Sequence, residues 1–381
     1  MKRFKVLFIS SSSRYRIPEE RSVYKKKFGA LSKIADISWI AVSESGKKSI
    51  GECGGAKLFL APRKGAKILD LMLFKEFALT EGLRVIKNRD IDIVYAQSPL
   101  MDGLMGAALK KLTGVKLIVG VHGDWEGEIR YSKPGIARFM PLINLWASFC
   151  LKNADLVRVI SKATEERALE FVEKDKISSA KFPALFDVDF FLEGEPKASK
   201  EDSAVFVGSL IGRKGVDHLV KAVPKIRNEF PEFKLYVVGR GALEKELGSM
   251  AESLGVGENV VFAGHQPMER VREYIDKSQM LVLPSMSEGL GRIALEAMSR
   301  SRPVIGSAVE GIKETVKDGH NGILIRPGDS DAIANAVIKL LEDKKLAAEM
   351  GKNGRRFVQE NYSVEKYVSH YERLFEEALG R

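Results

Sequence analysis

Apolar and polar residues alternate along this chain in blocks that predict short strands, each followed by a helix. In the first half, runs such as KVLFI at 5–9 and KLIVGV at 116–121 are each followed by a polar loop and a helical pattern. A second series of the same kind starts near residue 204, after an irregular stretch at 186–202. This order is typical of parallel sheets with crossover helices. We therefore expect two doubly wound α/β domains, at residues 1–190 and 200–362.

Two segments need separate interpretation. Residues 135–153 form a helical segment that is apolar nearly all round, which favours a buried core helix over one inserted into a membrane surface. Residues 10–18 are polar and predict a loop after the first strand. Ligands of doubly wound sheets bind at the carboxyl ends of the strands, so the loops that follow strands are the candidate binding regions.

Charge is unevenly distributed. The 381 residues carry a net charge of +10, and residues 1–190 hold 33 Lys and Arg against 22 Asp and Glu. A basic domain attracts anionic partners such as lipid head groups or phosphorylated acceptors; the alternative is a solvated basic surface. The basic residues that flank apolar positions on the early loops and helices are Arg14, Arg16, Arg21, Lys25, Lys26, Lys27, Arg63, Lys64 and Lys67.

Several classes of protein are disfavoured. Cys53 and Cys150 are far apart, which argues against a disulfide framework or a Cys-rich metal site. His218, His265, His320 and His370 do not cluster with acids at metal-ligand spacing. The N-terminal apolar run is too short for a signal peptide, and no charge-free stretch reaches transmembrane length. We expect a cytoplasmic protein, with the inner face of the membrane as an alternative location.

The stretch LVLPSMSEGLGRIALEA at 281–297 predicts a strand, a glycine loop and a helix that begins near Arg292. Free backbone N–H groups and the helix dipole make such a turn an anion site. Glu288 and Glu296 bracket it and could accept hydrogen bonds from sugar hydroxyls while the N–H groups hold an oxygen. Alternatively, Glu288 caps the helix and Glu296 is a solvated residue; the spacing does not separate these readings.

Two further loops could bind a ligand. Residues 208–215 follow a strand, and their glycines with Arg213 and Lys214 suit a phosphate, although the spacing is not that of a Walker loop. The alternative is a plain turn with surface charges. His122 ends the run KLIVGV and could donate to a sugar or phosphate oxygen; the alternative is a structural histidine.

The motifs together resemble the retaining, GT-B-fold glycosyltransferases of family four, also called glycosyl transferases group 1. SEGLGRIALEAM followed by RSRPVI is similar to that family's pair of glutamates separated by seven residues, and FVGSLIGRKG is similar to its phosphate loop. The resemblance implies a GT-B fold of two Rossmann-like domains facing across a cleft. It also implies that the last helix, at 364–381, packs back on the first domain.

By this resemblance, the chain would transfer a hexose from a nucleotide-sugar donor to an acceptor hydroxyl with retention, without a metal or cofactor. Lys214 would hold the diphosphate and Glu296 the ribose hydroxyls. Glu288 would contact the transferred sugar, and His122 the donor sugar or the acceptor. The backbone N–H groups beside Glu288 belong to Gly289, Leu290 and Gly291.

Two departures from the family pattern affect the site. Ser209, after Gly208 in the donor loop, stands where the family has arginine, so Arg213 would supply that charge. Ser12, Ser13 and Arg14 stand near the family's usual glycine pair, which suggests a polar, anionic or lipid-linked acceptor.

Two other functions stay open at this point. The first is a nucleotide-sugar epimerase of the same fold. The second is a non-catalytic anion- or nucleic-acid-binding protein, although basic residues interleaved with aromatic ones are missing, so we expect no specific nucleic-acid partner. The basic first domain is also consistent with peripheral contact with an anionic membrane.

Overall fold

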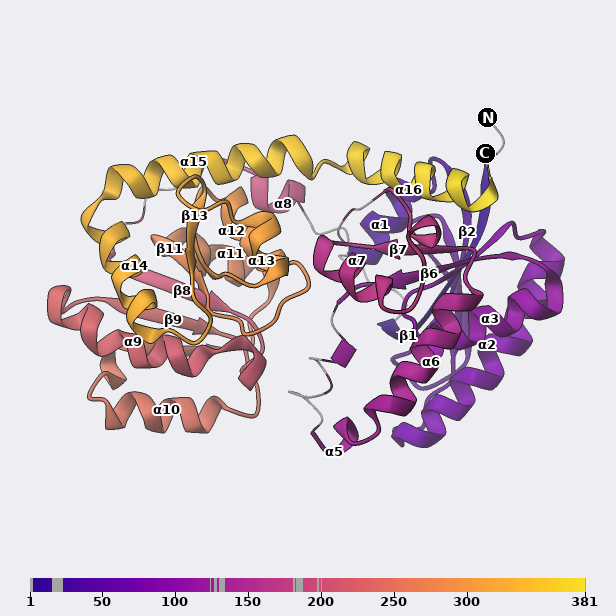
Figure 1. The fold of residues 1–381 in the computed structure, drawn as a ribbon, viewed down its shortest axis with the longest axis horizontal. Helices are drawn as coiled ribbons and strands as arrows, with labels where there is room; N and C mark the ends of the chain where they lie inside the picture. Colours follow the sequence, from indigo (N-terminus) through magenta and orange to yellow (C-terminus); the bar gives the residue numbers. More distant parts are fainter. Residues whose placement is uncertain are drawn as a thin grey trace. The chain divides into compact units, whose positions relative to one another are not determined.

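The computed structural model describes residues 3–15, 23–123, 125–126, 129, 134–180, 182, 188–196, 199 and 201–380, without the side chains of residues 12–15, 23, 67 and 134. The chain divides into two compact units (Figure 1). Unit 1 comprises Met1–His122, Arg138–Phe186 and Val364–Arg381; unit 2 comprises Gly123–Ala137 and Asp187–Ser363. Each unit has a mainly parallel sheet covered by helices, so the prediction of two Rossmann-like domains is confirmed.

Unit 1 contains a seven-stranded sheet in the order β3-β4-β2-β1-β5-β6-β7. Its strands are β1 (Phe4–Tyr15), β2 (Ala35–Ser43), β3 (Ser49–Cys53), β4 (Ala56–Ala61), β5 (Ile93–Ala96), β6 (Lys116–Val121) and β7 (Leu156–Val159). Every neighbouring pair is parallel except the β3–β4 hairpin. The expected loop at 10–18 is wrong over residues 10–15, because β1 continues through a register shift until Arg14 pairs with Val42. Residues 16–18 lie outside the described part.

Helices cover both faces of this sheet. They are α1 (Val23–Leu31), α2 (Lys67–Arg89), α3 (Met101–Thr113), α6 (Met140–Asn153), α7 (Lys162–Leu169) and α16 (Val364–Leu379). In unit 1 of Figure 1, α2, α3 and α6 lie below the sheet, and α1 and α16 lie above it. Tyr371 and Phe375 of α16 pack on Phe8 and Phe4 of β1, with ring centroids 6.3 and 5.4 Å apart. The last helix therefore completes the core of unit 1.

The long helix expected at 135–153 differs from the structure in two ways. It is divided into α5 (Pro134–Ala137) and α6, which has a proline in its first turn. In addition, α6 buries only one face, which includes Ala147, Cys150 and Leu151. Leu142, Leu145, Trp146 and Phe149 are exposed, so the prediction of a buried core helix is wrong for this face.

Unit 2 contains a six-stranded, all-parallel sheet in the order β10-β9-β8-β11-β12-β13. Its strands are β8 (Ser203–Val207), β9 (Lys234–Val238), β10 (Val260–Gly264), β11 (Met280–Leu283), β12 (Val304–Ser307) and β13 (Gly322–Ile325). Besides α5, the helices of unit 2 are α8 (Val188–Leu192), α9 (Val216–Glu229), α10 (Glu244–Ser253), α11 (Met268–Lys277), α12 (Arg292–Ser299), α13 (Glu310–Thr315), α14 (Ser330–Glu342) and α15 (Lys344–Asn361). Because all six strands are parallel, the loops after their carboxyl ends gather at one edge of the sheet.

Candidate functional site

The two predicted binding loops of unit 2 lie against each other, because they follow the neighbouring strands β8 and β11. The Met286 N–H donates to the carbonyl oxygen of Arg213 (2.8 Å), and Arg213 Nη1 donates to that of Ser287 (2.7 Å). Gly215 ends the first loop at φ +63°, and a Cβ there would overlap the Pro284 carbonyl oxygen. A glycine is therefore needed for the two loops to approach so closely.

The Glu288 carboxylate is the centre of this loop pair. Lys214 Nζ donates to Glu288 Oε2, and Ser285 Oγ donates to the same oxygen over 3.3 Å. Arg213 Nη1 lies 3.8 Å from it. The interpretation of Glu288 as a helix cap is wrong, because Gly291 is the N-cap of α12 and no side chain caps that helix. The ion pair instead holds the Lys214 ammonium at the carboxyl edge of the sheet.

The beginning of α12 offers backbone donors beside Glu288. Gly291 has φ +69°, and within the described residues the N–H groups of Gly289, Leu290 and Gly291 have no hydrogen-bond acceptor. Unpaired N–H groups at a helix start favour an anion or a sugar oxygen. Gly311 of α13 lies so close to the Glu288 carbonyl oxygen that a side chain there would overlap it. Sequence reasoning missed this contact, because residue 311 lies on a different loop.

Glu296 lies on α12 and is buried, with 9% of its surface exposed. Burial raises the pKa of its carboxyl to about 7, although Arg292 Nε, 3.1 Å from Oε1, acts in the opposite direction. The interpretation of Glu296 as a solvated residue is therefore wrong. A carboxyl in this environment can accept hydrogen bonds from hydroxyl groups and gains most when it is ionised.

The start of the loop after β8 contacts the loop after β9. The Gly208 N–H donates to the Val238 carbonyl oxygen (2.9 Å), and the Leu210 N–H donates to that of Arg240 (3.0 Å). Ser209 lies between them and is exposed at the same edge. The predicted donor-side residues of unit 2 thus lie on the loops after β8 and β11 and on α12, and contacts join Arg213, Lys214 and Glu288 among them.

His122 lies in unit 1, directly after β6. Its Nε2 is 3.3 Å from the hydroxyl of Tyr95 (β5) and 3.2 Å from Nη1 of Arg158 (β7). Arg158 is fully buried and donates to the Tyr95 hydroxyl (3.1 Å) and to the Phe182 carbonyl oxygen (2.7 Å). Sequence reasoning missed Tyr95 and Arg158; the available signal was an arginine inside the apolar run LVRV.

Burial, reinforced by nearby positive charge, disfavours protonation of His122. Burial, Arg158 and Lys27 hold the His122 pKa well below its usual value. Lys27 of α1 is half-buried, with Nζ 4.8 Å from the Phe8 ring centroid and 5.9 Å from that of Tyr371, and burial lowers its pKa to about 7. His122 is therefore neutral near pH 7, with one ring nitrogen able to donate and the other to accept.

Three acceptor-side predictions remain without a described site. Ser12, Ser13 and Arg14 belong to β1, but their side chains lie outside the described part. Among the residues that the structure describes, no group of three or more His, Cys, Asp or Glu could hold a metal ion. No helix in that part is long and apolar enough to cross a membrane.

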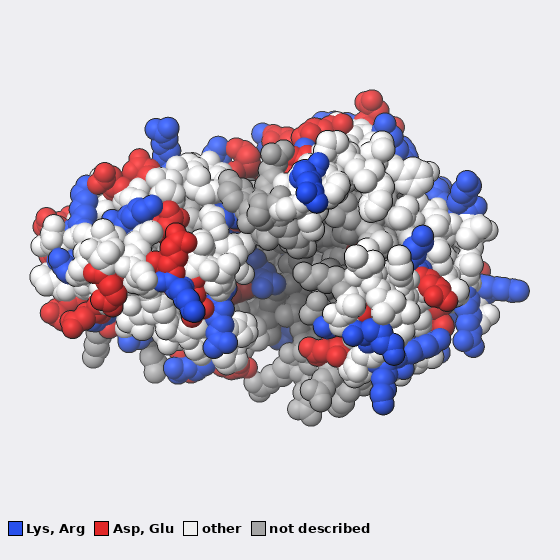
Figure 2. Space-filling view, turned by 90° about the horizontal axis from the view of Figure 1, so that it is seen from below, with Lys and Arg blue, Asp and Glu red and all other residues white. Residues whose placement is uncertain are grey.

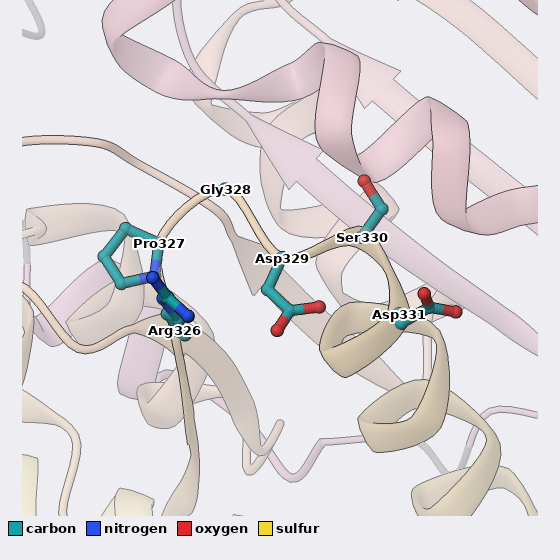
Figure 3. Close-up of a pocket in the computed structure, with 6 residues that line it drawn as sticks. All are labelled: Arg326, Pro327, Gly328, Asp329, Ser330 and Asp331. Carbon is teal, nitrogen blue, oxygen red and sulfur yellow. The ribbon is translucent and has the colours of Figure 1, made fainter.

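A pocket in unit 2 lies on the loop from β13 to α14, lined by residues 326–331 (Figure 3). The Asp329 carboxylate caps α14 by accepting from the Ala332 N–H (2.8 Å), and Asp331 accepts from Lys225 Nζ (3.0 Å). Its acids are thus engaged in structural contacts. No residue predicted for donor binding lines this pocket.

Comparisons with known proteins match both units. The model described as Glycosyltransferase Family 4 matches residues 37–179, and the one described as Glycosyl transferases group 1 matches residues 187–357. The GDP-mannose-dependent alpha-(1-6)-phosphatidylinositol monomannoside mannosyltransferase of Mycolicibacterium smegmatis is 29% identical, over 79% of this chain and 82% of that protein. The N-acetyl-alpha-D-glucosaminyl L-malate synthase of Bacillus anthracis is 26% identical, over 80% of each chain.

The sucrose-phosphate synthase from Thermosynechococcus elongatus has a similar fold, with a TM-score of 0.82 and 21% identity over 99% of this chain and 100% of that one.

Proposed function

The chain belongs to the glycosyltransferases of the GT-B fold, and from that premise we propose that it transfers a hexose from a nucleotide-sugar to an acceptor hydroxyl with retention of configuration. In this proposal, unit 2 binds the donor. The acceptor is a sugar, a lipid or a phosphorylated molecule at the edge of unit 1 that carries His122. No metal or cofactor takes part in the proposed reaction.

The observation that carries the proposal is the convergence of Arg213, Lys214, Glu288 and the start of α12 at one edge of unit 2. A departing diphosphate needs positive charge and oriented N–H groups. Lys214 and Arg213 supply the charge, and Gly289, Leu290 and Gly291 supply the N–H groups. In the proposed complex, Lys214 is shared between Glu288 and the diphosphate.

The remaining roles follow the same geometry. Glu296 accepts hydrogen bonds from the ribose hydroxyls, Glu288 contacts the transferred sugar, and Gly208 and Ser209 border the donor. Neutral His122 donates to the donor sugar or to the acceptor. Arg213 has a second role as a brace of the loop that carries Glu288, so Arg213→Ala is expected to weaken donor binding by more than a lost surface charge.

The two relatives named above support the donor and acceptor classes. One is named for GDP-mannose and a phosphatidylinositol-linked acceptor, and the other for an acceptor that is an anion, malate. The first is named a mannosyltransferase and the second a synthase of a glucosaminyl malate. Both names describe joining a sugar to another molecule, which favours a transferase over an epimerase. We place the protein in the cytoplasm, at the inner face of the membrane when its acceptor is a lipid.

A thermal-shift panel with UDP, GDP, ADP, CMP and their sugar conjugates tests the donor site. A ligand at 100 times its dissociation constant adds about 2.7 kcal/mol to the stability, so one nucleotide should stand out. Lys214→Ala should cost about 1.5–3 kcal/mol of donor binding, the contribution of a charged hydrogen bond. Equal shifts in wild type and Lys214→Ala would contradict the assignment of Lys214.

Product analysis then separates the alternatives. NMR of the freshly formed glycoside should show the anomeric configuration of the donor. An epimerase would instead change the nucleotide-sugar without any acceptor. A nucleic-acid-binding protein would show no nucleotide-sugar shift and a steep salt dependence of binding.

A further inference from the structure

The exposed apolar side chains of unit 1 are concentrated on two helices. On α6, Leu142, Leu145, Trp146 and Phe149 are exposed and follow the spacing i, i+3, i+4 and i+7, so they form one stripe. In most helices such a stripe faces the core, but here the core is contacted by the opposite face. Leu145 is 64% exposed and Trp146 is 47% exposed. The stripe is thus an apolar surface of unit 1.

The first two turns of α2 add to this surface. Its exposed apolar residues are Ile68, Leu69, Leu71 and Met72. The rest of the outer face of α2 is polar, beginning with Lys75 and Glu76. The exposed large apolar residues of α2 therefore lie at the N-terminal end of the helix.

Helix α3 joins the two apolar segments into one layer. A Cβ on Gly82 of α2 would lie 2.9 Å from Leu109 of α3, and a Cβ on Gly103 of α3 would lie 2.8 Å from the Cβ of Cys150 on α6. Helix α2 begins shortly after the carboxyl end of β4, and α6 ends shortly before the amino end of β7. The first turns of both helices therefore lie toward the edge of the sheet that carries His122. We call the exposed residues of α2 and α6, with Phe139, the apolar edge.

The charge around the apolar edge is positive. Residues 63–75 and 138–152 contain six basic residues and one acidic residue, Asp70. The Asp70 carboxylate accepts from the N–H groups of Lys64 (2.6 Å) and Gly65 (3.2 Å) and pairs with Arg63 (3.5 Å), so its charge is directed at its own loop. Lys64, Lys75, Arg138 and Lys152 are exposed. Figure 2 shows unit 1 from below, with a broad white surface and more blue than red side chains around it.

We propose that the apolar edge is a docking surface for an anionic lipid bilayer. Aromatic and aliphatic side chains next to exposed cations match the boundary between acyl chains and anionic head groups. The cations would also be attracted to anionic lipids before the apolar residues insert. The inference rests on the proposed function in one respect: docking at this edge would bring a membrane-embedded acceptor to the side of unit 1 that carries His122.

Vesicle binding by the full chain tests the proposal. The protein should float with vesicles of phosphatidylcholine and phosphatidylglycerol, bind far less to phosphatidylcholine alone, and be released by salt. The double variant Leu145→Gln/Trp146→Gln should lower the partition coefficient at least about tenfold, because two exposed apolar groups are lost. The matched control is Leu112→Gln, which alters a residue that is 66% exposed at the opposite end of α3. An equal loss of vesicle binding in the double variant and in Leu112→Gln would overturn the proposal. Wild-type binding to neutral vesicles as strong as to anionic ones would do the same.

Tryptophan fluorescence gives a local readout. The chain has three tryptophans, of which Trp39 and Trp125 are buried, so a blue shift on adding anionic vesicles should come from Trp146. Trp146→Phe should keep vesicle binding and lose the shift. If the wild-type protein binds anionic vesicles without a blue shift of its tryptophan fluorescence, the apolar edge is not the docking surface.

Two further measurements separate this inference from its rivals. If light scattering shows a dimer that Leu145→Gln/Trp146→Gln converts to a monomer, the surface pairs two copies and the lipid proposal fails. A donor-induced thermal shift that survives in the double variant shows that the fold and the donor site are intact. Vesicle binding without any donor shift in wild type would leave the docking surface standing and reject the proposed function instead.

Discussion

At the scale of single residues, unit 2 holds two carboxylates in different electrostatic environments. Glu288 is paired with Lys214 and receives a hydrogen bond from Ser285, whereas Glu296 is buried with one partly exposed arginine nearby. Burial favours the neutral form of a carboxylate, which raises the pKa of Glu296. The two glutamates thus differ in their partners and in their burial, although only seven residues separate them in the sequence.

The raised pKa of Glu296 predicts a pH dependence of donor binding. Hydroxyl groups donate more strongly to an ionised carboxylate, so nucleotide affinity should rise as the pH increases through about 7 and then level off. Glu296→Gln should weaken binding by about 1–2 kcal/mol above that pH and abolish the rise, because an amide does not titrate. Calorimetric titration between pH 5.5 and 8.5, roughly 1.5 units on either side of that pKa, would measure both effects.

The control for this prediction is Glu246→Gln, an exposed glutamate on α10 that should keep the wild-type profile. Stability gives an independent check. The folded-state pKa of Glu296 lies above its ordinary value of 4.5, so the free energy of unfolding should fall as the pH rises from about 4.5 to 7. Glu296→Gln should remove that loss; an unchanged pH profile in this variant would argue against titration of Glu296.

At the scale of elements, the donor site depends on how closely two loops approach. Gly215→Ala would place a Cβ at φ +63° against the Pro284 carbonyl oxygen, so the loop carrying Lys214 must move. We expect a loss of about 1–3 kcal/mol in the free energy of unfolding, together with weaker nucleotide binding. Gly319→Ala is the matched control, because Gly319 has φ +71° but a Cβ added there would have no atom within 4 Å. Equal loss of donor affinity in both variants would show that backbone strain alone, not overlap between the loops, matters.

The elements also show how far local pattern can be used to predict this fold. Residues 116–121 form the predicted strand with the predicted bounds, because they are a compact apolar block followed by a polar turn. Strand β3 was missed because SIGEC holds a single large aliphatic residue and pairs only at the sheet edge. Helix α6 is apolar on two faces, and periodicity cannot decide which face a neighbouring helix covers.

The candidate site residues also divide into those that a local sequence motif predicts and those that only the fold brings together. Glu288, Glu296 and Lys214 lie on short continuous motifs that resemble a family signature, so they could be identified before the fold was known. Tyr95 and Arg158 come from separate strands, and only the sheet brings them to His122. Sequence spacing carries no information about such neighbours.

At the scale of the whole molecule, unit 1 is built from separated parts of the chain, with α16 supplying core residues. The Tyr371 ring lies 4.8 Å from Phe182 and 6.3 Å from Phe8, and Glu377 accepts from Ser178 Oγ (2.6 Å). Tyr371→Ala should therefore destabilise unit 1 by about 3–5 kcal/mol, as expected for a large aromatic residue in a core.

Scanning calorimetry should show this loss in the transition of unit 1, while the donor-induced shift of unit 2 persists. Glu376→Ala, on the exposed side of the same helix, is the control and should leave both transitions in place. A loss of donor binding in Tyr371→Ala as large as the loss of unit 1 stability would mean that the two units do not unfold separately.

The return of α16 to unit 1 has a consequence for synthesis on the ribosome. Chains usually fold from the N-terminal domain onward as they emerge, but here residues 187–363 of unit 2 are made before residues 364–379 of unit 1. Unit 2 can therefore finish folding while the sheet of unit 1 still lacks the helix that covers Phe4 and Phe8. Unit 1 begins to be translated before unit 2 but is completed after it, and chaperones would find its uncovered face throughout the translation of unit 2.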